Sequence, residues 1–408
     1  LSFSKENGLK LREYFNLLDL IDEKKYNNRK NKSFNENLEE FEELIELSVK
    51  KMLMSDAKMG AFVSGGIDSS LIASLAKKHV SSDFELFTAN VMGGLSEYDD
   101  ALKLSYALNM KLFDYKFEPQ HFVRDISKAT WYYETPIVRH ANGVPFSNVS
   151  ELARTNGVKA VLTGEGADEL FLGYPNLLTA KYDRILKSPI KFVNAIYSIF
   201  PALKRYLNLT DNGFEYLMNK TSQNFSRDIV RNECFKRTSF LKFKEKDFYA
   251  QTILMLNEGI ISLLWRNDRM GMMNSIESRF PFLDENILEF AINLPLKYKI
   301  GYIRKFYNYK HPFLIDKKIV RMSANKYLPK NLVYKRKNGF PLYGLTNLKV
   351  DNNFFKNGFV SNLLKINSKV EIDLVGNNVD SYTVSKLAML EIWGRLFVHK
   401  QSIDSLNS

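Results

Sequence analysis

The sequence predicts an α/β fold, with a parallel sheet in its first half and a largely helical C-terminal half. Between Met59 and Leu162, short apolar runs alternate with amphipathic stretches, which is the pattern of strands and crossover helices in a parallel sheet. Two of the apolar runs lead directly into glycine-rich loops. Beyond Tyr174 the pattern changes to long stretches of helical periodicity.

The length and period of each run define the individual elements. The predicted strands are Met59–Val63, Phe84–Val91, Leu112–Phe117 and Val158–Leu162. The predicted helices are Glu36–Leu53, Leu71–Lys78 and Tyr98–Leu108, with later ones within Asn232–Trp265 and Ile287–Leu294. We expect the later helices to pack against the sheet and to complete its site.

The loop Ser64–Ser70 follows the first strand and has the sequence SGGIDSS. Gly65 and Gly66 lack a Cβ atom, so the oxygens of an anion can come close to several backbone N–H groups. Serine hydroxyls add donors, and the helix that begins here directs its dipole at the anion. The loop is therefore predicted to bind a chain of phosphates. The Walker spacing with its lysine is missing.

A second glycine-rich loop, Thr163–Glu169, reads TGEGADE and follows the fourth strand. Ligands of an open parallel sheet bind beyond the carboxyl ends of its strands, where the strand order reverses, so both loops are expected to face one crevice. A carboxylate among phosphates is explained by Mg²⁺, and Asp68 and Asp168 are predicted to share one such ion. The alternative for the second loop is a solvated helix start, because acidic residues favour first turns.

Together with three later segments, these loops resemble the synthetase domain of the asparagine synthetase family. The matching segments are SGGIDSS, TGEGADELFLGY, DRMGMMNSIESRFPFLD at Asp268–Asp284, YLPKNLVYKRKNGF at Tyr327–Phe340 and LEIW at Leu390–Trp393. The resemblance implies a Rossmann-like sheet of the adenine nucleotide α-hydrolase (PP-loop) type.

The resemblance also implies an ATP-dependent ligase that uses Mg²⁺. A substrate carboxylate attacks the α-phosphate of ATP, which gives an acyl-adenylate and pyrophosphate, and an amine then displaces AMP. Lys337 matches the family's lysine on the α-phosphate, although it also belongs to a basic surface cluster. Glu165 matches the acid that orients the amine or accepts its proton.

Further positions match the family's nucleotide and substrate contacts. The predicted nucleotide-binding residues are Val63, Ser64, Gly65, Gly66, Asp68, Ser69, Ser70, Ala89, Thr163 and Gly164. Asp268, Glu277 and Arg279 match positions near the substrate end of the site, where a charged acid needs opposite partners. Glu277 and Arg279 can equally form a structural ion pair.

Two features of the sequence concern the substrate. Lys335 stands where the family usually has arginine, and a lysine is a poorer bidentate clamp. His140, in the segment ETPIVRHAN, is either a base or a hydrogen-bonding residue. Aspartate is the predicted substrate, amidated through β-aspartyl-AMP; the alternatives are another carboxylate, such as a sugar acid, a peptide or a β-lactam precursor, and a catalytically idle nucleotide-binding partner of a glutaminase.

The predicted organisation is a linker at residues 1–35 and a synthetase domain at residues 36–400. Within that domain, residues 36–174 form the α/β nucleotide-binding core and residues 175–400 the helical part. Family members usually carry an N-terminal glutaminase domain that delivers ammonia. This domain is missing before the linker, and we expect the chain to lack its amino-terminal part; the alternative is a naturally single-domain protein. Ammonia then comes from such a domain or from a separate subunit.

Composition limits the partners. The formal net charge of +12 suits a polyanion such as ATP, and the lysines are spread along the chain without a recognisable RNA-binding module, so no nucleic-acid partner is predicted. No apolar run reaches the roughly 18 residues of a membrane span. The single cysteine, Cys234, is read as an inert packed thiol and favours a reducing, cytoplasmic setting. A homodimer is left open.

Overall fold

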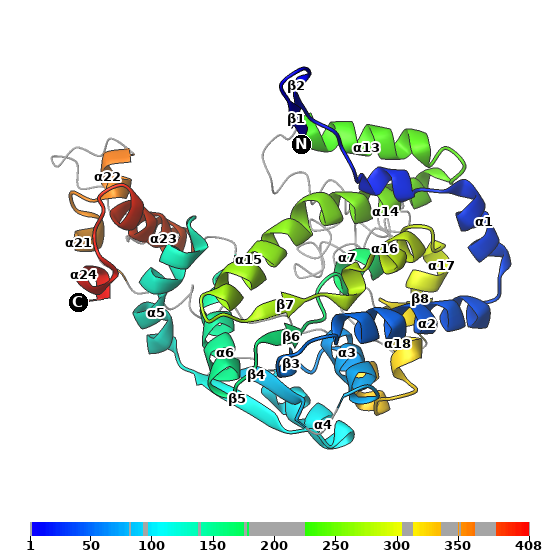
Figure 1. Cartoon of the computed structure of the whole chain (residues 1–408), viewed down its shortest axis with the longest axis horizontal. Coiled ribbons are helices and arrows are strands. Elements are labelled where there is room, and N and C mark those ends of the chain that lie inside the picture. The colour runs from blue at the N-terminus through cyan, green and yellow to red at the C-terminus, as the bar shows by residue number, and fades with distance from the viewer. Residues whose placement is uncertain are drawn as a thin grey trace, which may run out of the picture. The chain divides into compact units, whose positions relative to one another are not determined.

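The structure is a computed structural model, drawn in Figure 1. It describes residues 2–80, 83–92, 97–137, 140–174, 178, 225–303, 313–335, 350, 352–363 and 381–407. The chain forms two compact units. The first unit comprises Leu1–Ser48, Glu165–Ile261 and Phe282–Ser323, and the second comprises Val49–Gly164, Ser262–Pro281 and Ala324–Ser408.

The second unit contains a five-stranded parallel sheet, which confirms the predicted fold class. Its strand order is β5 (Leu112–Phe117), β4 (Glu85–Val91), β3 (Met59–Phe62), β6 (Ala160–Leu162) and β7 (Glu277–Arg279). Every neighbouring pair is parallel. The first four strands are the predicted ones, and β7 is an addition.

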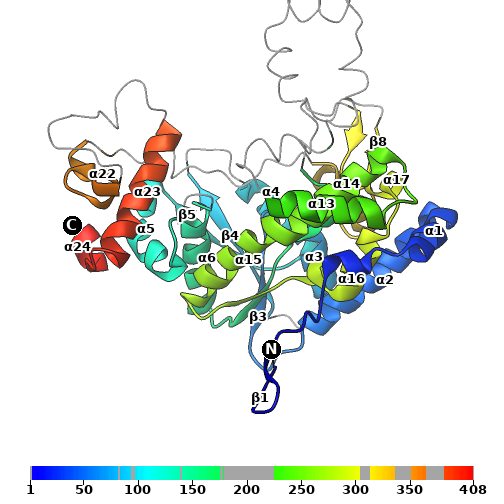
Figure 2. The same ribbon diagram turned by 90° about the horizontal axis from the view of Figure 1, so that it is seen from above.

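The order of the strands places a switch point between β3 and β6. From β3 the chain runs through α3 (Ile67–Lys77) to β4 and through α4 (Tyr98–Leu108) to β5, and it then returns through α6 (Gly143–Thr155) to the other side of β3. Because crossovers are right-handed, these two directions of travel put helices on opposite faces. Figure 2 shows α3 and α6 on opposite sides of the sheet.

The remaining helices of the second unit include a group around α5. This group consists of α5 (Pro119–Tyr133), α21 (Asn352–Phe355), α22 (Phe359–Leu363), α23 (Ser381–Phe397) and α24 (Ile403–Asn407), of which α23 and α24 pack on α5. The short helix α19 (Lys330–Val333) also belongs to the second unit. Buried Phe122 and Ile126 of α5 share a core cluster with Met389 and Ile392 of α23. The segment LEIW therefore lies in the packed closing helix that the sequence predicted.

The first unit is mostly helical. It contains β1 (Ser2–Ser4), β2 (Gly8–Lys10), η1 (Leu17–Leu20), α1 (Glu23–Asn31), α7 (Ala167–Phe171), α13 (Phe225–Arg237), α14 (Phe243–Leu254), a π-helical turn (Met255–Gly259), α16 (Glu285–Ile292), α17 (Leu296–Lys299), β8 (Gly301–Tyr302), β9 (Leu314–Ile315) and α18 (Lys318–Ala324). Three α-helices contain residues of both units: α2 (Phe34–Met52), α15 (Ile260–Met272) and α18, whose last residue belongs to the second unit. In the core of the first unit, the aromatic ring of Phe41 packs against the rings of Phe171 and Phe290.

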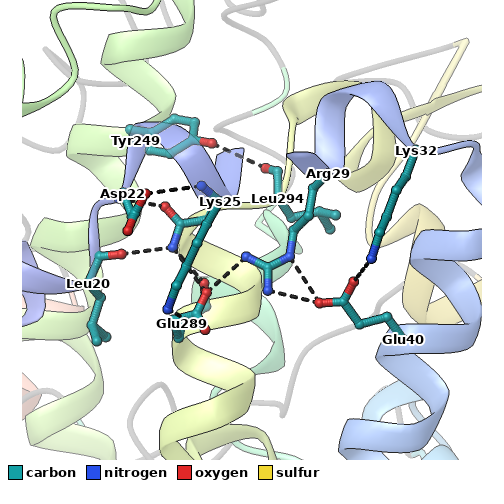
Figure 3. Close-up of polar contacts among 10 residues, drawn as sticks. Leu20, Asp22, Lys25, Arg29, Lys32, Glu40, Tyr249, Glu289 and Leu294 are labelled. Carbon is teal, nitrogen blue, oxygen red and sulfur yellow. Dashed lines mark hydrogen bonds and ion pairs between the residues drawn. The ribbon is translucent and has the colours of Figure 1, made fainter. Parts of the chain in front are cut away.

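The leader of the chain packs onto this unit through α1. Asp22 caps the helix by accepting a hydrogen bond from the backbone N–H of Lys25. In Figure 3 the guanidinium of Arg29 lies between two carboxylates. Its Nη2 donates to Glu40 at 2.9 Å, and its Nη1 donates to Glu289 at 2.9 Å.

None of the helices in the described part of the chain has the length and apolar character that crossing a lipid bilayer requires.

Candidate active site

The loop Ser64–Ser70, called the phosphate loop below, joins β3 to the start of α3. Gly65 has a φ of +67°, a conformation that favours glycine. A Cβ at Gly65 would lie 2.5 Å from the Cβ and carbonyl carbon of Asp100, in the first turn of α4. Gly66 follows as the residue that precedes α3. The motif therefore folds as a strand, a tight turn and a helix, as its sequence predicts.

The serines of the phosphate loop order its backbone. Ser69 Oγ accepts the N–H of Ser64 at 3.3 Å, and Ser64 Oγ accepts the N–H of Gly66 at 3.3 Å. The hydroxyl of Ser70 is buried and has no hydrogen-bond partner among the described residues, and the same holds for the hydroxyl of Thr163. Buried hydroxyls of this kind need a partner, and a bound ligand can supply it.

The second glycine-rich loop meets the phosphate loop. It leaves β6, the strand next to β3, and the N–H of Thr163 donates to the carbonyl of Arg279 at 3.0 Å. A Cβ at Gly164 would lie 2.5 Å from the backbone nitrogen of Ser69 and 2.9 Å from Asp68 Cβ. The two motifs thus touch at the switch point, and only glycine fits at position 164.

The acidic end of the second loop belongs to the first unit. Gly166, at φ +97°, precedes α7, which carries Asp168. Asp168 Oδ1 lies 2.7 Å from the ammonium of Lys317, and both side chains are largely buried. A Cβ at Gly173 would overlap this pair, at 1.9 Å from Lys317 Cε and 2.0 Å from Asp168 Oδ1. The glycine of the FLGY segment is therefore needed for the pair to form.

Glu169 and Tyr174 lie beside Asp168 and are both buried. The hydroxyl of Tyr174 donates to Glu169 Oε1 at 2.6 Å. Burial, reinforced by the charge of Asp168, raises the pKa of Glu169 to about 7. Burial and the neighbouring carboxylates raise the pKa of Tyr174 well above its usual value. Glu165, the predicted proton acceptor, is half-buried at the start of this segment.

Two of the predicted nucleotide-binding residues, Val63 and Ala89, match the family's contacts to the adenine base and lie at the ends of two strands. Val63 is buried after β3, and its N–H donates to the carbonyl of Phe87 at 2.9 Å. Ala89 is half-buried near the end of β4, which is hydrogen-bonded to β3. Both stand at the carboxyl edge of the sheet, on the same side as the phosphate loop.

The residues predicted near the substrate are placed differently. Asp268 is exposed on α15. Glu277 pairs with Arg279 Nε at 2.9 Å, and Arg279 Nη1 donates to the carbonyls of Met52 and Met54, each at 2.8 Å. This geometry is the structural ion pair considered as the alternative, and a substrate role for these three residues stays a prediction.

Three other predicted residues complete the comparison. Lys337 lies outside the described residues. The carbonyl of His140 accepts the N–H of Gly143 at 2.7 Å, at the start of α6. Cys234 is buried in α13, and burial raises the pKa of its thiol to about 12. The thiol is therefore protonated at neutral pH, in keeping with an inert role.

The chemistry of Asp68 and Asp168 fits Mg²⁺, which prefers oxygen ligands and binds through one or two carboxylates plus phosphate oxygens. No group of three or more His, Cys, Asp or Glu side chains arranged for a metal occurs in the described ranges. An ion held here would rely on the nucleotide for further ligands. Asp68 and Asp168 belong to different units, so the shared ion remains a prediction.

Two charged residues near these loops are not among the predicted site residues, although the sequence marks Lys335 as a departure from the family's arginine. Lys317 has a φ of +49° and pairs with Asp168, and Lys335 forms an ion pair with Asp100 beside Gly65. Nothing local in the sequence singles out Lys317 within its lysine-rich segment. The departure at Lys335 from the family's arginine was the one available signal.

Comparisons with known proteins find similarity to asparagine synthetases. The family model described as asparagine synthase matches residues 40–367. Asparagine synthetase [glutamine-hydrolyzing] 1 of Bacillus subtilis is 28% identical over 317 residues, covering 72% of this chain and 48% of the relative. A putative asparagine synthetase [glutamine-hydrolyzing] 1 of Methanocaldococcus jannaschii is 27% identical over 359 residues, covering 81% of this chain and 53% of the relative.

A solved NH3-dependent NAD synthetase from Campylobacter jejuni is 20% identical and covers 58% of this chain and 96% of its own, with a TM-score of 0.28, which is too low to support an argument. The chain spans about half the length of the curated relatives it matches. Because the family model covers most of the chain, the chain belongs to the asparagine synthase family.

Proposed function

We propose that this chain is the synthetase part of a glutamine-hydrolysing asparagine synthase, which converts aspartate to asparagine with ATP. A carboxylate oxygen of aspartate attacks the α-phosphorus, the bond between that phosphorus and the bridging oxygen to the β-phosphate breaks, and pyrophosphate leaves. Ammonia then attacks the acyl carbon, AMP leaves, and the adduct loses a proton. The observation that carries the proposal is the contact of Gly164 with Asp68 and Ser69.

The nucleotide lies across this contact in the proposed reaction. The backbone and hydroxyls of the phosphate loop bind the phosphates, and the buried hydroxyls of Ser70 and Thr163 gain partners there. Val63 and Ala89 contact the base through their backbone, and Thr163 and Gly164 contact the adenine and ribose. Asp68 and Asp168 would hold Mg²⁺, which would offset the negative charge of the phosphates.

Charged side chains act at the reacting atoms. Lys337 stabilises the charge that develops on the α-phosphate, and Glu165 takes the proton from the ammonium-like adduct. Lys317 keeps the Asp168 carboxylate in place at 2.7 Å and adds a positive charge at the acidic end of the site. Asp268, Glu277 and Arg279 stand nearest the amino-acid substrate.

Ammonia is supplied by a glutaminase domain or subunit, because the relatives described as glutamine-hydrolyzing are about twice as long as the matched region. A reducing, cytoplasmic compartment suits a chain with one cysteine.

Exchange of labelled pyrophosphate into ATP tests the first step. The whole chain with Mg²⁺ and ATP should show exchange that depends on aspartate. If a sugar acid, a peptide or a β-lactam precursor supports exchange and aspartate does not, the assignment of aspartate as the substrate is wrong. No exchange with any carboxylate would overturn the adenylation itself.

The role of Lys337 has a matched control in the same basic segment. Lys337→Ala should abolish exchange and leave ATP binding within about threefold, because one charge is lost from the transition state. Lys330→Ala removes an exposed lysine of α19 and should leave exchange unchanged. An unchanged rate in Lys337→Ala would remove this residue from the mechanism.

A further inference from the structure

Asp100 lies directly behind the phosphate loop. Its Cβ and carbonyl carbon, with the backbone nitrogen of Ala101, come within 2.6 Å of the position that a Cβ on Gly65 would take. The first turn of α4 is thus in contact with the backbone of the loop. A shift of Asp100 by a fraction of an ångström would have to move Gly65 as well, because packed backbone atoms leave no free space.

Lys335 holds the carboxylate of Asp100 from another part of the chain. The ammonium of Lys335 forms an ion pair with Asp100 Oδ2, and the two side chains are 17% and 16% exposed. Burial by itself would raise the pKa of Asp100, but hydrogen bonds from Lys335 and Lys103 outweigh it and leave this pKa below its usual value. The pair is therefore ionised at neutral pH.

The same carboxylate has a second, weaker partner. Lys103 Nζ lies 3.1 Å from Asp100 Oδ1, one turn along α4, and its side chain is 55% exposed. An exposed pair of this kind contributes little, because water screens it and two long side chains must be ordered. The shielded pair with Lys335 is the one able to fix the position of Asp100.

Lys335 also stands close in sequence to a proposed catalytic group. Lys337 follows it by two residues, which is at most about 7 Å of extended chain. An anchor at Lys335 therefore limits where Lys337 can go. The ordinary explanation of Asp100, a carboxylate favoured in a first helical turn, accounts for its place on α4 but not for its lysine partner.

We infer that Asp100 and Lys335 form a positioning pair, which sets the phosphate loop through Gly65 and ties the chain before Lys337 to the same point. The inference rests on the proposed adenylation. Neither side chain needs to touch the nucleotide. The pair acts by fixing two parts of the site relative to one phosphate chain, and small misplacements of such parts cost large factors in rate.

Four variants of the whole chain test the pair: Lys335→Met, Asp100→Asn, the reversed double variant D100K/K335D, and Lys335→Arg. Both single neutral variants should lower kcat for aspartate-dependent exchange at least tenfold and raise the Kd for ATP at least fivefold, with the KM for aspartate within twofold. Lys335→Arg should keep most of the activity. The reversed double variant should recover at least a third of the kcat that either single neutral variant loses.

The control variant is Lys103→Met, which removes the exposed partner of the same carboxylate and should leave kcat and the Kd for ATP within twofold. Far-UV circular dichroism confirms that each variant is folded. If Asp100→Asn leaves kcat unchanged while Lys335→Met abolishes it, Lys335 contacts the nucleotide itself and the inference is wrong. Equal losses in Lys103→Met would also overturn it.

ATP binding separates this inference from the proposed function. Suppose that the wild-type chain binds ATP but that none of the tested carboxylates supports pyrophosphate exchange. The proposed adenylation is then wrong, and the Asp100–Lys335 pair is judged by the Kd for ATP alone. A Kd unchanged in both single neutral variants then refutes the pair, and a fivefold rise that Lys335→Arg avoids supports it.

Discussion

Lys299 is a buried base whose charge opposes folding. Its side chain is only 3% exposed at the end of α17, and its ammonium lies 5.6 Å from the ring centroid of Tyr249. Burial lowers its pKa to about 7 from an unperturbed 10.5. Between these two values the unfolded chain binds more protons than the folded chain, so this residue makes stability rise with pH from about 7 to 10.5 and lowers it fully below that window.

We expect Lys299→Met to stabilise the fold most at pH 7 and below. The gain there is at most about 5 kcal/mol, from 1.36 kcal/mol for each pKa unit, and it should fall toward zero near pH 10.5. Urea unfolding at several pH values measures the difference from wild type. Lys297→Met, at an exposed position of the same helix, should change stability much less at pH 7 than Lys299→Met does. A constant difference for Lys299→Met would contradict a neutral folded-state lysine.

Gly164 offers a second test at the scale of one residue. In Gly164→Ala the new methyl group would overlap the backbone of Ser69 at 2.5 Å, so the two loops must separate. We expect ATP binding to weaken at least tenfold. Gly157→Ala is the matched control, since Gly157 has a φ of +82° and nothing within 4 Å of its added methyl group. It should cost about 1 kcal/mol of stability and leave ATP binding unchanged; equal binding in both variants would contradict the contact.

Sequence reasoning located these glycines but not their charged neighbours. A glycine motif implies close backbone approach, so Gly65 and Gly66 were identifiable before any coordinates, and the resemblance to the family added Gly164. The pairing of Asp168 with Lys317 joins separate segments of the chain. Such a pair is decided by tertiary packing, and a lysine among other lysines carries no local mark of it.

At the scale of elements, the bounds of strands and helices were predicted correctly where the apolar pattern was clear. A strand was missed where only its pairing with a neighbouring strand makes it a strand. Leu112–Phe117 and Tyr98–Leu108 have the predicted bounds. The strand β7, Glu277–Arg279, has only three residues, with a charge at each end. It is a strand because β6 offers an open edge. The N–H of Glu277 donates to the carbonyl of Lys159 at that edge, at 2.9 Å. Its own sequence gives no periodic signal.

The leader shows the same dependence on distant partners. The resemblance to the family implies a linker here, and the composition is polar. In the structure the N–H of Asp22 donates to the side chain of Asn293 at 2.9 Å, and Asn293 donates to the carbonyl of Leu20 at 2.7 Å. These contacts join the leader to the residue that ends α16. Composition records the polarity of the segment, whereas its order comes from side chains far along the chain.

Arg29 should dominate the attachment of the leader. Its side chain is 9% exposed and its guanidinium bridges Glu40 and Glu289, each about a quarter exposed. Arg29→Met leaves both carboxylates without this donor, which we expect to cost about 2–4 kcal/mol, below the value for a fully buried pair. Urea unfolding at pH 7 measures the loss. Lys25→Met, which removes a half-exposed partner of Glu289, should cost less than about 1 kcal/mol; equal costs would assign the attachment to other contacts.

At the scale of the molecule, the two compact units are not successive lengths of chain. The chain passes between them after Ser48, Gly164, Ile261, Pro281 and Ser323. Three of these points fall inside continuous α-helices, α2, α15 and α18. The sequence predicted a different division, into a core at residues 36–174 and a helical part at residues 175–400, and that division remains a prediction. Periodicity reveals helices and strands but not how often a chain returns to the same core.

We therefore expect both units to unfold in one cooperative transition. A helix broken at a unit boundary loses hydrogen bonds in both units. Unfolding of either unit therefore destabilises the other. The chain provides its own probes, because Trp131, Trp265 and Trp393 all belong to the second unit and the single cysteine, Cys234, belongs to the first.

Tryptophan fluorescence in urea follows the second unit, and a brief pulse of a thiol reagent at pH 8 follows the first. The buried thiol, with its pKa near 12, is unreactive until its surroundings open and this pKa returns toward about 8.5. The two midpoints should coincide, and so should the two slopes. Cys234→Ala removes the labelling signal and confirms its origin. Labelling that is complete at a urea concentration where the fluorescence is still native would show that the first unit unfolds independently.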